Sequence, residues 1–145
     1  MTYAHLDSPA WSELLEVAWA AREHAHAPYS GFRVGSALAW RREGSIWIEA
    51  GCNVENAAYP LTVCAERNAI GAAVAKGLKD GDLLALAVVT EAEALTPPCV
   101  GCRQVMVEFA ADLPVLLANR HSRALHDLST LLPLAFSGRN FLPKG

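Results

Sequence analysis

Two short stretches decide the fold: Thr62-Val63-Cys64-Ala65-Glu66-Arg67-Asn68-Ala69-Ile70 and Pro98-Cys99-Val100-Gly101-Cys102-Arg103-Gln104. Cys99 and Cys102 are three residues apart, so on a helical turn they share one face and can bind the same ion. Cys64 must reach that ion from a different element. The sequence therefore predicts that the starts of two helices meet at one metal site.

The thiols predict a zinc site with one Zn²⁺ per chain. Three cysteines can hold the ion and leave its fourth position open for water. Glu66 lies two residues after Cys64 and does not share its helix face, so we expect it beside the water as a proton carrier. Three thiolates leave the site with a net negative charge. Arg67 is therefore the candidate donor of a hydrogen bond to a cysteine sulfur, supported by the two helix N-termini.

Other interpretations of the thiols remain open. Structural zinc sites are usually closed by a fourth ligand, and Cys52 is available, although its apolar surroundings are typical of a core residue. Redox proteins share the Cys-x-x-Cys spacing of Cys99 and Cys102. A zinc-stabilised binding protein without turnover would have no need of Glu66. The combination of the two stretches favours a catalytic site.

Composition narrows the classes of function. The chain has 145 residues, and we expect residues 1–145 to form one domain. Its 52% hydrophobic content is above average and indicates surface buried against partner subunits. The net charge of −3 and the lack of a basic run argue against nucleic acid and favour a small neutral substrate. No signal segment or membrane span is expected, and free thiols fit a cytoplasmic location.

Hydrophobic patterning predicts a helix–sheet–helix layered α/β domain. A first amphipathic helix is expected from a Ser8 cap and Pro9 to a point before Pro28. Strands are expected at 32–40, 46–52, 83–89 and 114–118, with a turn at 41–44 joining the first two. Two further helices should run from Cys64 to Gly77 and from the second cysteine pair to Ala110. The segment 125–136 is expected to begin as a helix and become irregular at Pro133.

Polar residues before Cys64 have two interpretations. Asn53 and Glu55 offer a donor and an acceptor that suit sugar hydroxyls, if a bulge turns both toward one ligand. Asn53 and Asn56 are also common turn formers, with Glu55 solvated, and chemistry alone favours that interpretation. Without further context, an aromatic residue such as Phe32 is predicted to lie in the core. Phe136 is either buried in the core of its own chain or exposed, where it could contact a neighbouring subunit.

Five segments together resemble a cytidine deaminase of the small, homotetrameric, zinc-dependent kind. They cover positions 28 to 136 in the family's order and read Pro28-Tyr29-Ser30-Gly31-Phe32-Arg33-Val34-Gly35, Gly51-Cys52-Asn53-Val54-Glu55-Asn56-Ala57-Ala58-Tyr59, Cys64-Ala65-Glu66-Arg67, Pro98-Cys99…Cys102-Arg103-Gln104 and Leu131-Leu132-Pro133-Leu134-Ala135-Phe136. The resemblance implies a five-stranded mixed sheet between helices. It also implies hydrolytic deamination of cytidine and deoxycytidine to uridine and deoxyuridine, a step of pyrimidine salvage.

The resemblance also implies roles for particular residues. Cys64, Cys99 and Cys102 would bind zinc, and Glu66 would carry the protons. Asn53 and Glu55 would hold the ribose hydroxyl, Phe32 would pack on the base, and the Ala65 backbone would place the pyrimidine. Sites shared with neighbouring subunits would include Ala57, Tyr59 and Phe136.

Three departures from the family pattern bear on substrate range. Val100-Gly101 replaces the usual Gly-Ala, Pro97 replaces a common Ser, and Pro60 follows Tyr59 as in only some members. Val100 is bulkier and less flexible than the usual residue beside the metal, which bears on the substrate range more than on the chemistry. A deaminase of another aminopyrimidine nucleoside, such as an antibiotic nucleoside, is the alternative.

Overall fold

A five-stranded sheet forms the centre of the computed structural model, which describes residues 2–143. The strand order is β2-β1-β3-β4-β5, and only β3 and β4 pair in parallel. The strands are β1 (Gly35–Arg42), β2 (Ser45–Cys52), β3 (Leu83–Val89), β4 (Pro114–Ala118) and β5 (Arg123–Asp127). The five-stranded mixed sheet implied by the resemblance is confirmed.

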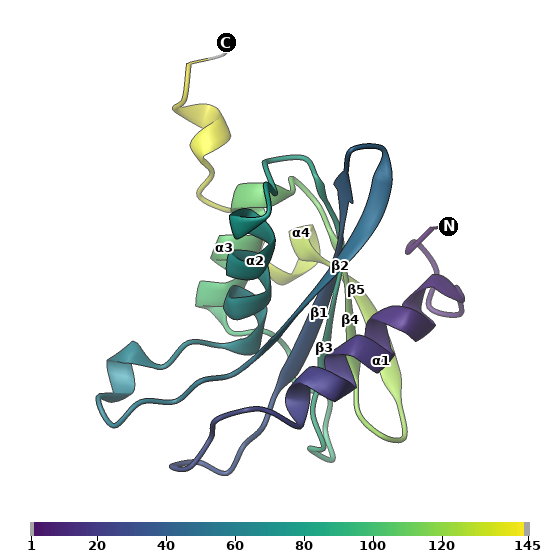
Figure 1. Ribbon diagram of the computed structural model, residues 1–145. Helices are drawn as coiled ribbons and strands as arrows, with labels where there is room; N and C mark the ends of the chain where they lie inside the picture. The colour runs from purple at the N-terminus through teal and green to yellow at the C-terminus, as the bar shows by residue number, and fades with distance from the viewer. Residues whose placement is uncertain (1, 144–145) are drawn as a thin grey trace.

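Helices cover both faces of this sheet (Figure 1). Helix α1 (Ala10–Arg22) lies on one face, and α2 (Ala65–Ala75), α3 (Val100–Phe109) and the single turn α4 (Leu128–Leu131) lie on the other. Two 3₁₀ turns, Tyr59–Leu61 and Gly138–Asn140, lie outside these layers. The predicted helix–sheet–helix architecture is therefore confirmed, and no helix within residues 2–143 is both long and apolar enough to cross a bilayer.

Successive side chains of the central strands point to opposite faces of the sheet, so each face has its own hydrophobic core. Ala37 and Ala39 of β1 pack with Trp11 of α1, whereas Leu38 and Trp40 pack in the cluster formed with α2 and α3. Small side chains on one face leave room for the large side chains of α1, and large ones fill the space under the opposite helices. Strands β1 and β3 are buried on both faces, which explains their nearly continuous apolar sequence.

The structure corrects four predicted boundaries. Strand β1 starts at Gly35 instead of Phe32, and both hairpin strands extend to a two-residue turn at Glu43 and Gly44. Both turn residues have positive φ (50° and 78°), as tight hairpins of the I′ class require. Helix α1 starts one residue later than expected, with Pro9 as its N-cap, while the Ser8 hydroxyl accepts a 3.4 Å hydrogen bond from the Ala10 amide.

The prediction of a helix starting at Leu125 is wrong. Residues Arg123–Asp127 form β5, which pairs antiparallel with β4 and places Leu125 opposite Leu116. The helix is only the turn Leu128–Leu131 that follows. A free β4 edge offers backbone hydrogen bonds to any short segment that can extend beside it, and this tertiary pairing overrides the local preference.

Gly51 lets α2 approach the sheet closely where the helix begins. A Cβ atom at this position of β2 would overlap the Ala65 carbonyl oxygen and the Ala69 amide nitrogen. The N-terminus of α2, which carries Cys64, is therefore placed by contact with the backbone of β2.

Replacing Gly51 with alanine tests this contact. We expect Gly51→Ala to lower the free energy of unfolding by about 1–3 kcal/mol, the usual cost of overpacking a close contact. Gly71→Ala is the matched control, because a Cβ at that exposed helix position meets no described atom within 4 Å. The control should stabilise the chain by up to about 1 kcal/mol through helix propensity. Urea denaturation measures both, and equal stability of Gly51→Ala and the parent would contradict the account.

Candidate active site

Three cysteine sulfurs converge where α2 and α3 begin. Cys64 is the N-cap residue of α2, Cys99 is the N-cap residue of α3, and Cys102 lies in the first turn of α3. The Sγ atoms of Cys64 and Cys99 are 3.8 Å apart, and those of Cys99 and Cys102 are 3.4 Å apart. Both helix N-termini thus present their positive ends to the same cluster.

This cluster fits one zinc ion. Zinc–sulfur bonds of about 2.3 Å in a tetrahedral site place the sulfurs about 3.8 Å apart. All three Sγ atoms lie within 4.8 Å of one another, and Cys52 does not belong to the group. Among residues 2–143 no fourth Cys, His, Asp or Glu joins the three sulfurs, which is the arrangement of a catalytic zinc site that keeps one position open.

The electrostatics of the cluster favour metal binding. The hydrogen bond with the Cys102 thiol and the contact with Arg67 lower the pKa of the Cys64 thiol to about 5. The interaction with Cys64 and burial raise the pKa of Cys102. Arg67 Nη2 donates a hydrogen bond to Cys64 Sγ at 3.5 Å. This is the contact with a cysteine sulfur that the sequence predicts for Arg67. Because thiolates bind the metal, zinc must displace the remaining thiol protons, and its affinity should rise with pH.

Glu66 lies inside the site in the first turn of α2. Its side chain is only 3% exposed, and it lines a cavity together with Cys64 and Cys99. Burial raises the pKa of this carboxyl group above its ordinary value. A raised pKa makes the carboxyl group a better proton acceptor than an exposed glutamate, which suits a general acid–base group.

The cavity next to the cluster has a volume of about 220 Å³ and combines most of the predicted substrate residues. Phe32, Asn53, Glu55 and Ala65 line it, in addition to Glu66, Cys64 and Cys99. The sequence analysis missed Ser30, Val34, Thr62, Val88 and Thr96, which also line it. Ser30, Val34 and Thr62 belong to the quoted segments, but none of the five side chains is a metal ligand or a titratable group that would single it out, and the folding together of distant segments brings them to the cavity.

Asn53 and Glu55 both hold the loop that carries Phe32. The Asn53 amide donates to the Phe32 carbonyl and accepts from the Val34 amide, each at 2.8 Å. Glu55 Oε1 accepts from the Tyr29 and Ser30 amides at 2.9 and 3.1 Å. The Ser30 hydroxyl and these amides lower the pKa of Glu55, so its carboxylate stays ionised. Neither residue is a simple turn former, because each anchors a segment far away in the chain.

Three predicted residues lie outside this cavity. Tyr59 is exposed and packs edge-on against Tyr29, with ring centroids 5.7 Å apart. Ala57 is exposed in the same loop. Phe136 is 71% exposed and stacks on Phe141 at 5.0 Å, so it does not plug its own core. Within one chain these residues do not contribute to the cavity wall.

Of the departures from the family pattern, Pro97 lines the cavity, whereas Val100 does not. The side chain of Val100 is exposed at the start of α3. In the single chain the Val100 side chain therefore does not form part of the cavity wall.

Comparison with known proteins decides the family. Residues 10–117 match the model of the cytidine and deoxycytidylate deaminase zinc-binding region. The chain belongs to this family. It is 43% identical over 129 residues to the cytidine deaminase of Halalkalibacterium halodurans, covering 88% of this chain and 94% of that protein. It is 45% identical over 119 residues to the cytidine deaminase of Sporosarcina psychrophila, covering 81% and 84%.

Solved structures of family members share the fold. A crystal structure of cytidine deaminase from Burkholderia pseudomallei aligns with a TM-score of 0.79 at 46% identity, over 86% of this chain and 97% of that chain. The cytidine deaminase of Mycobacterium tuberculosis aligns with a TM-score of 0.71 at 37% identity, over 89% and 98%. The resemblance drawn from the sequence is confirmed, and the zinc expectation agrees with both the family and the cysteine cluster.

A ligand substitution tests the zinc site. Cys99→Ser should remove most of the bound zinc, because a serine hydroxyl is a far weaker zinc ligand than a thiolate. Cys99 is exposed, so the variant should still fold. Cys52→Ser is the matched control and should keep one zinc per chain. Elemental analysis after dialysis against a chelator gives both numbers, and the assignment is wrong if the control loses zinc or Cys99→Ser retains it.

Proposed function

We propose that this protein is a zinc-dependent hydrolase that deaminates cytidine and deoxycytidine to uridine and deoxyuridine, releasing ammonia in pyrimidine salvage. The observation that carries the proposal is the buried Glu66 carboxyl group beside a three-sulfur cluster in one cavity. Family membership and cytidine deaminase relatives along most of the chain support it.

In this proposal Cys64, Cys99 and Cys102 hold the metal, and Glu66 moves the protons. Zinc, when bound there, supplies a Lewis acid that lowers the pKa of a water molecule. Glu66 accepts a proton from the attacking water and delivers it to N3 of the pyrimidine, which makes C4 electrophilic. A C4–O bond forms, Glu66 carries the remaining proton of the added hydroxyl group to the amino group, and the C4–N bond breaks to release ammonia and leave the C4 carbonyl.

The rest of the cavity would bind the nucleoside. Phe32 offers a ring to pack on the base, and the Ala65 backbone at the start of α2 offers polar groups to the pyrimidine edge. Glu55, as an ionised carboxylate, is a strong acceptor for a ribose hydroxyl. The Asn53 amide would complete the sugar contact and also fixes the Phe32 carbonyl.

The charge of the cavity favours a nucleoside over a nucleotide. Among the described residues that line it there is no Lys, Arg or His, while Glu55 and Glu66 are both acidic. A phosphate on the sugar would enter a region of like charge with no cation to pair with it. Within a family that covers both cytidine and deoxycytidylate deaminases, this supports the uncharged substrate.

A substrate panel tests the proposed activity. The zinc-loaded protein should convert cytidine and deoxycytidine, and its kcat/KM for cytidine 5′-monophosphate should be lower by roughly 100-fold or more because of charge repulsion in the cavity. Glu66→Gln is the matched control. It should keep its zinc and lose about 10²–10⁴-fold of the rate, because it cannot carry a proton.

Ultraviolet absorbance follows all these reactions. Preference for the monophosphate would contradict the nucleoside assignment. Preference for a modified nucleoside, such as an aminopyrimidine antibiotic, would move the proposal to the alternative substrate. A Glu66→Gln variant with a near-normal rate would contradict the mechanism.

The proposal includes a cytoplasmic homotetramer whose active sites are shared between chains. Large apolar side chains that a single chain leaves exposed include Tyr59, Leu61, Leu134 and Phe136. Leu134 is also fixed at a φ of 50°, a conformation that non-glycine residues rarely adopt. Obligate interfaces are more apolar than ordinary surface, so burial against neighbouring chains would account for this exposure. Ala57, Tyr59 and Phe136 would then complete a neighbour's cavity.

The state of assembly can be measured directly. Light scattering should give about four times the 15.5 kDa mass of one chain. Phe136→Ala should weaken substrate binding by about 1–3 kcal/mol, the size of a base–aromatic stacking contact. Ile46→Ala, at an exposed position near the hairpin turn, is the control and should leave KM unchanged. A fully active monomer would contradict the shared sites.

A further inference from the structure

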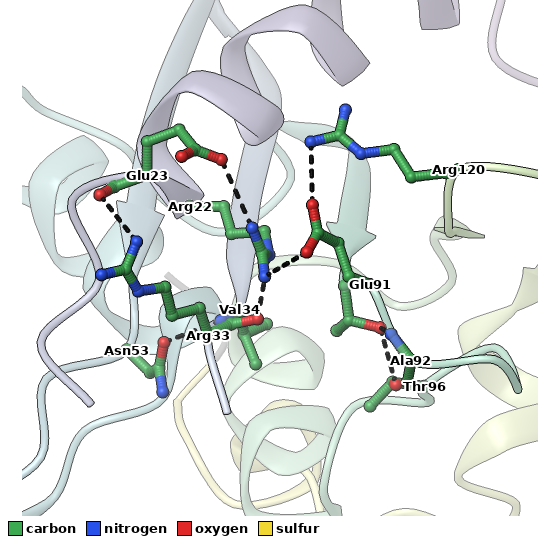
Figure 2. A network of polar contacts seen from close by, with 10 residues as sticks. Arg22, Glu23, Arg33, Val34, Asn53, Glu91, Ala92, Thr96 and Arg120 are labelled. Atoms are coloured by element: carbon green, nitrogen blue, oxygen red, sulfur yellow. Dashed lines mark hydrogen bonds and ion pairs between the residues drawn. The ribbon is translucent and has the colours of Figure 1, made fainter. Parts of the chain in front are cut away.

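A buried arginine lies behind the cavity, between two segments that form its wall. Arg22, the last residue of α1, is 9% exposed. Its Nε donates to the Arg33 carbonyl at 3.2 Å, and its Nη2 pairs with Glu91 Oε2, also at 3.2 Å. A third contact joins Nη1 to Glu23 Oε1 at 3.3 Å. Figure 2 shows the guanidinium between the Arg33 segment and Glu91.

The first of these segments, residues 32–34, is held on both sides. Asn53 binds the Phe32 carbonyl and the Val34 amide, and Arg22 binds the Arg33 carbonyl between them. Phe32 and Val34 both line the cavity. The position of this wall therefore depends on Arg22 as well as on Asn53.

The second segment, residues 90–97, follows β3 and carries Thr96 and Pro97 into the cavity wall. Thr90 and Thr96 hydroxyl oxygens are 3.0 Å apart, which closes the segment into a compact loop. Asn119 Nδ2 donates to the Ala92 and Glu93 carbonyls at 3.2 and 2.9 Å. Glu91 projects from this loop to Arg22, as Figure 2 shows.

Arginine is suited to such a link. Its planar guanidinium can donate to a backbone carbonyl and a carboxylate at the same time, and in a fixed geometry. A buried guanidinium also requires partners for its charge, so the contacts with Glu91 and the carbonyl support each other. Arg120 Nη2 holds the other Glu91 oxygen at 3.2 Å while its guanidinium lies over the Trp19 ring, which keeps Glu91 oriented.

We propose that Arg22 and Glu91 are positioning residues that set the spacing of the two cavity walls, residues 32–34 and 90–97, and thereby set the affinity for the pyrimidine nucleoside. The inference rests on the proposed function. The cysteine cluster and Glu66 lie on α2 and α3, and neither Arg22 nor Glu91 makes a hydrogen bond or ion pair with them among the described residues. Loss of the link should therefore raise KM and leave the proton-transfer steps, and kcat, nearly unchanged.

Glu91→Ala tests the link, and Glu23→Ala is its matched control. Both glutamates pair with Arg22, at 3.2 and 3.3 Å, and their side chains are 51% and 57% exposed. Only Glu91 belongs to the cavity loop. We expect Glu91→Ala to raise KM for cytidine about fivefold to tenfold, with kcat within about twofold, since one partly exposed charge-assisted contact is lost. Glu23→Ala should change neither constant.

Two further variants keep the test decisive. Glu91→Gln keeps a hydrogen-bond acceptor without the charge and should raise KM by less than Glu91→Ala, and it replaces that variant if alanine prevents folding. The double variant Arg22→Gln/Glu91→Gln should have the same KM as Arg22→Gln alone, because the Arg22–Glu91 ion pair is already lost in the single variant. The zinc content should stay at the parent value, because the Arg22–Glu91 ion pair does not contact the cysteine cluster.

The inference is overturned if KM is unchanged in the Glu91 variants, if kcat falls while KM stays constant, or if Glu23→Ala raises KM equally. A parent enzyme that does not turn over cytidine would overturn the proposed function as well. An active parent with an insensitive KM overturns the inference alone.

Discussion

The structure depends on the requirement that three sulfurs from two helix N-termini meet at one point. Cys64 and Cys99 are the N-cap residues of α2 and α3, and Cys102 lies in the first turn of α3, so the two helices must start side by side on the same face of the sheet. Gly51 allows this on the sheet side, because it lets the first turn of α2 lie against the backbone of β2. The parallel pairing of β3 with β4, joined through α3, directs the second cysteine pair to the same edge. The site is thus a consequence of how helices pack on this sheet.

The same arrangement determines the chemistry of the site. A cluster of three sulfurs carries more negative charge than three histidines would, which makes it a weaker activator of water. Two helix N-termini and the Arg67 contact to Cys64 reduce that charge. Glu66, two residues after Cys64, is the second residue of α2, and burial raises the pKa of its carboxyl group. The four consecutive residues 64–67 at the start of α2 therefore contribute both a metal ligand and the proton-carrying group. The two cavity walls would bind the substrate.

Local patterns in the sequence predicted the parts that local physics controls. The apolar runs at 83–89 and 114–118 gave the bounds of β3 and β4, and the position of Gly77 after α2 matched the helix end. Strand β5 was missed because Arg123-Ala124-Leu125-His126-Asp127 is short and polar at both ends, and only pairing with β4 makes it a strand. The roles of Asn53, Glu55 and Arg22 in holding the cavity loops were invisible for the same reason. Their partners lie far away in the chain, and no spacing rule connects them.

The central claim is that zinc binds among Cys64, Cys99 and Cys102 with Glu66 facing its open position. Anomalous diffraction at the zinc absorption edge, from crystals of the protein purified with its metal, tests this most directly. The account predicts one peak per chain about 2.3 Å from each of the three sulfurs, with the Glu66 carboxylate beside a fourth ligand that is not a protein atom. A peak with Cys52 as the fourth ligand, or no peak and a disulfide between Cys99 and Cys102, would contradict it.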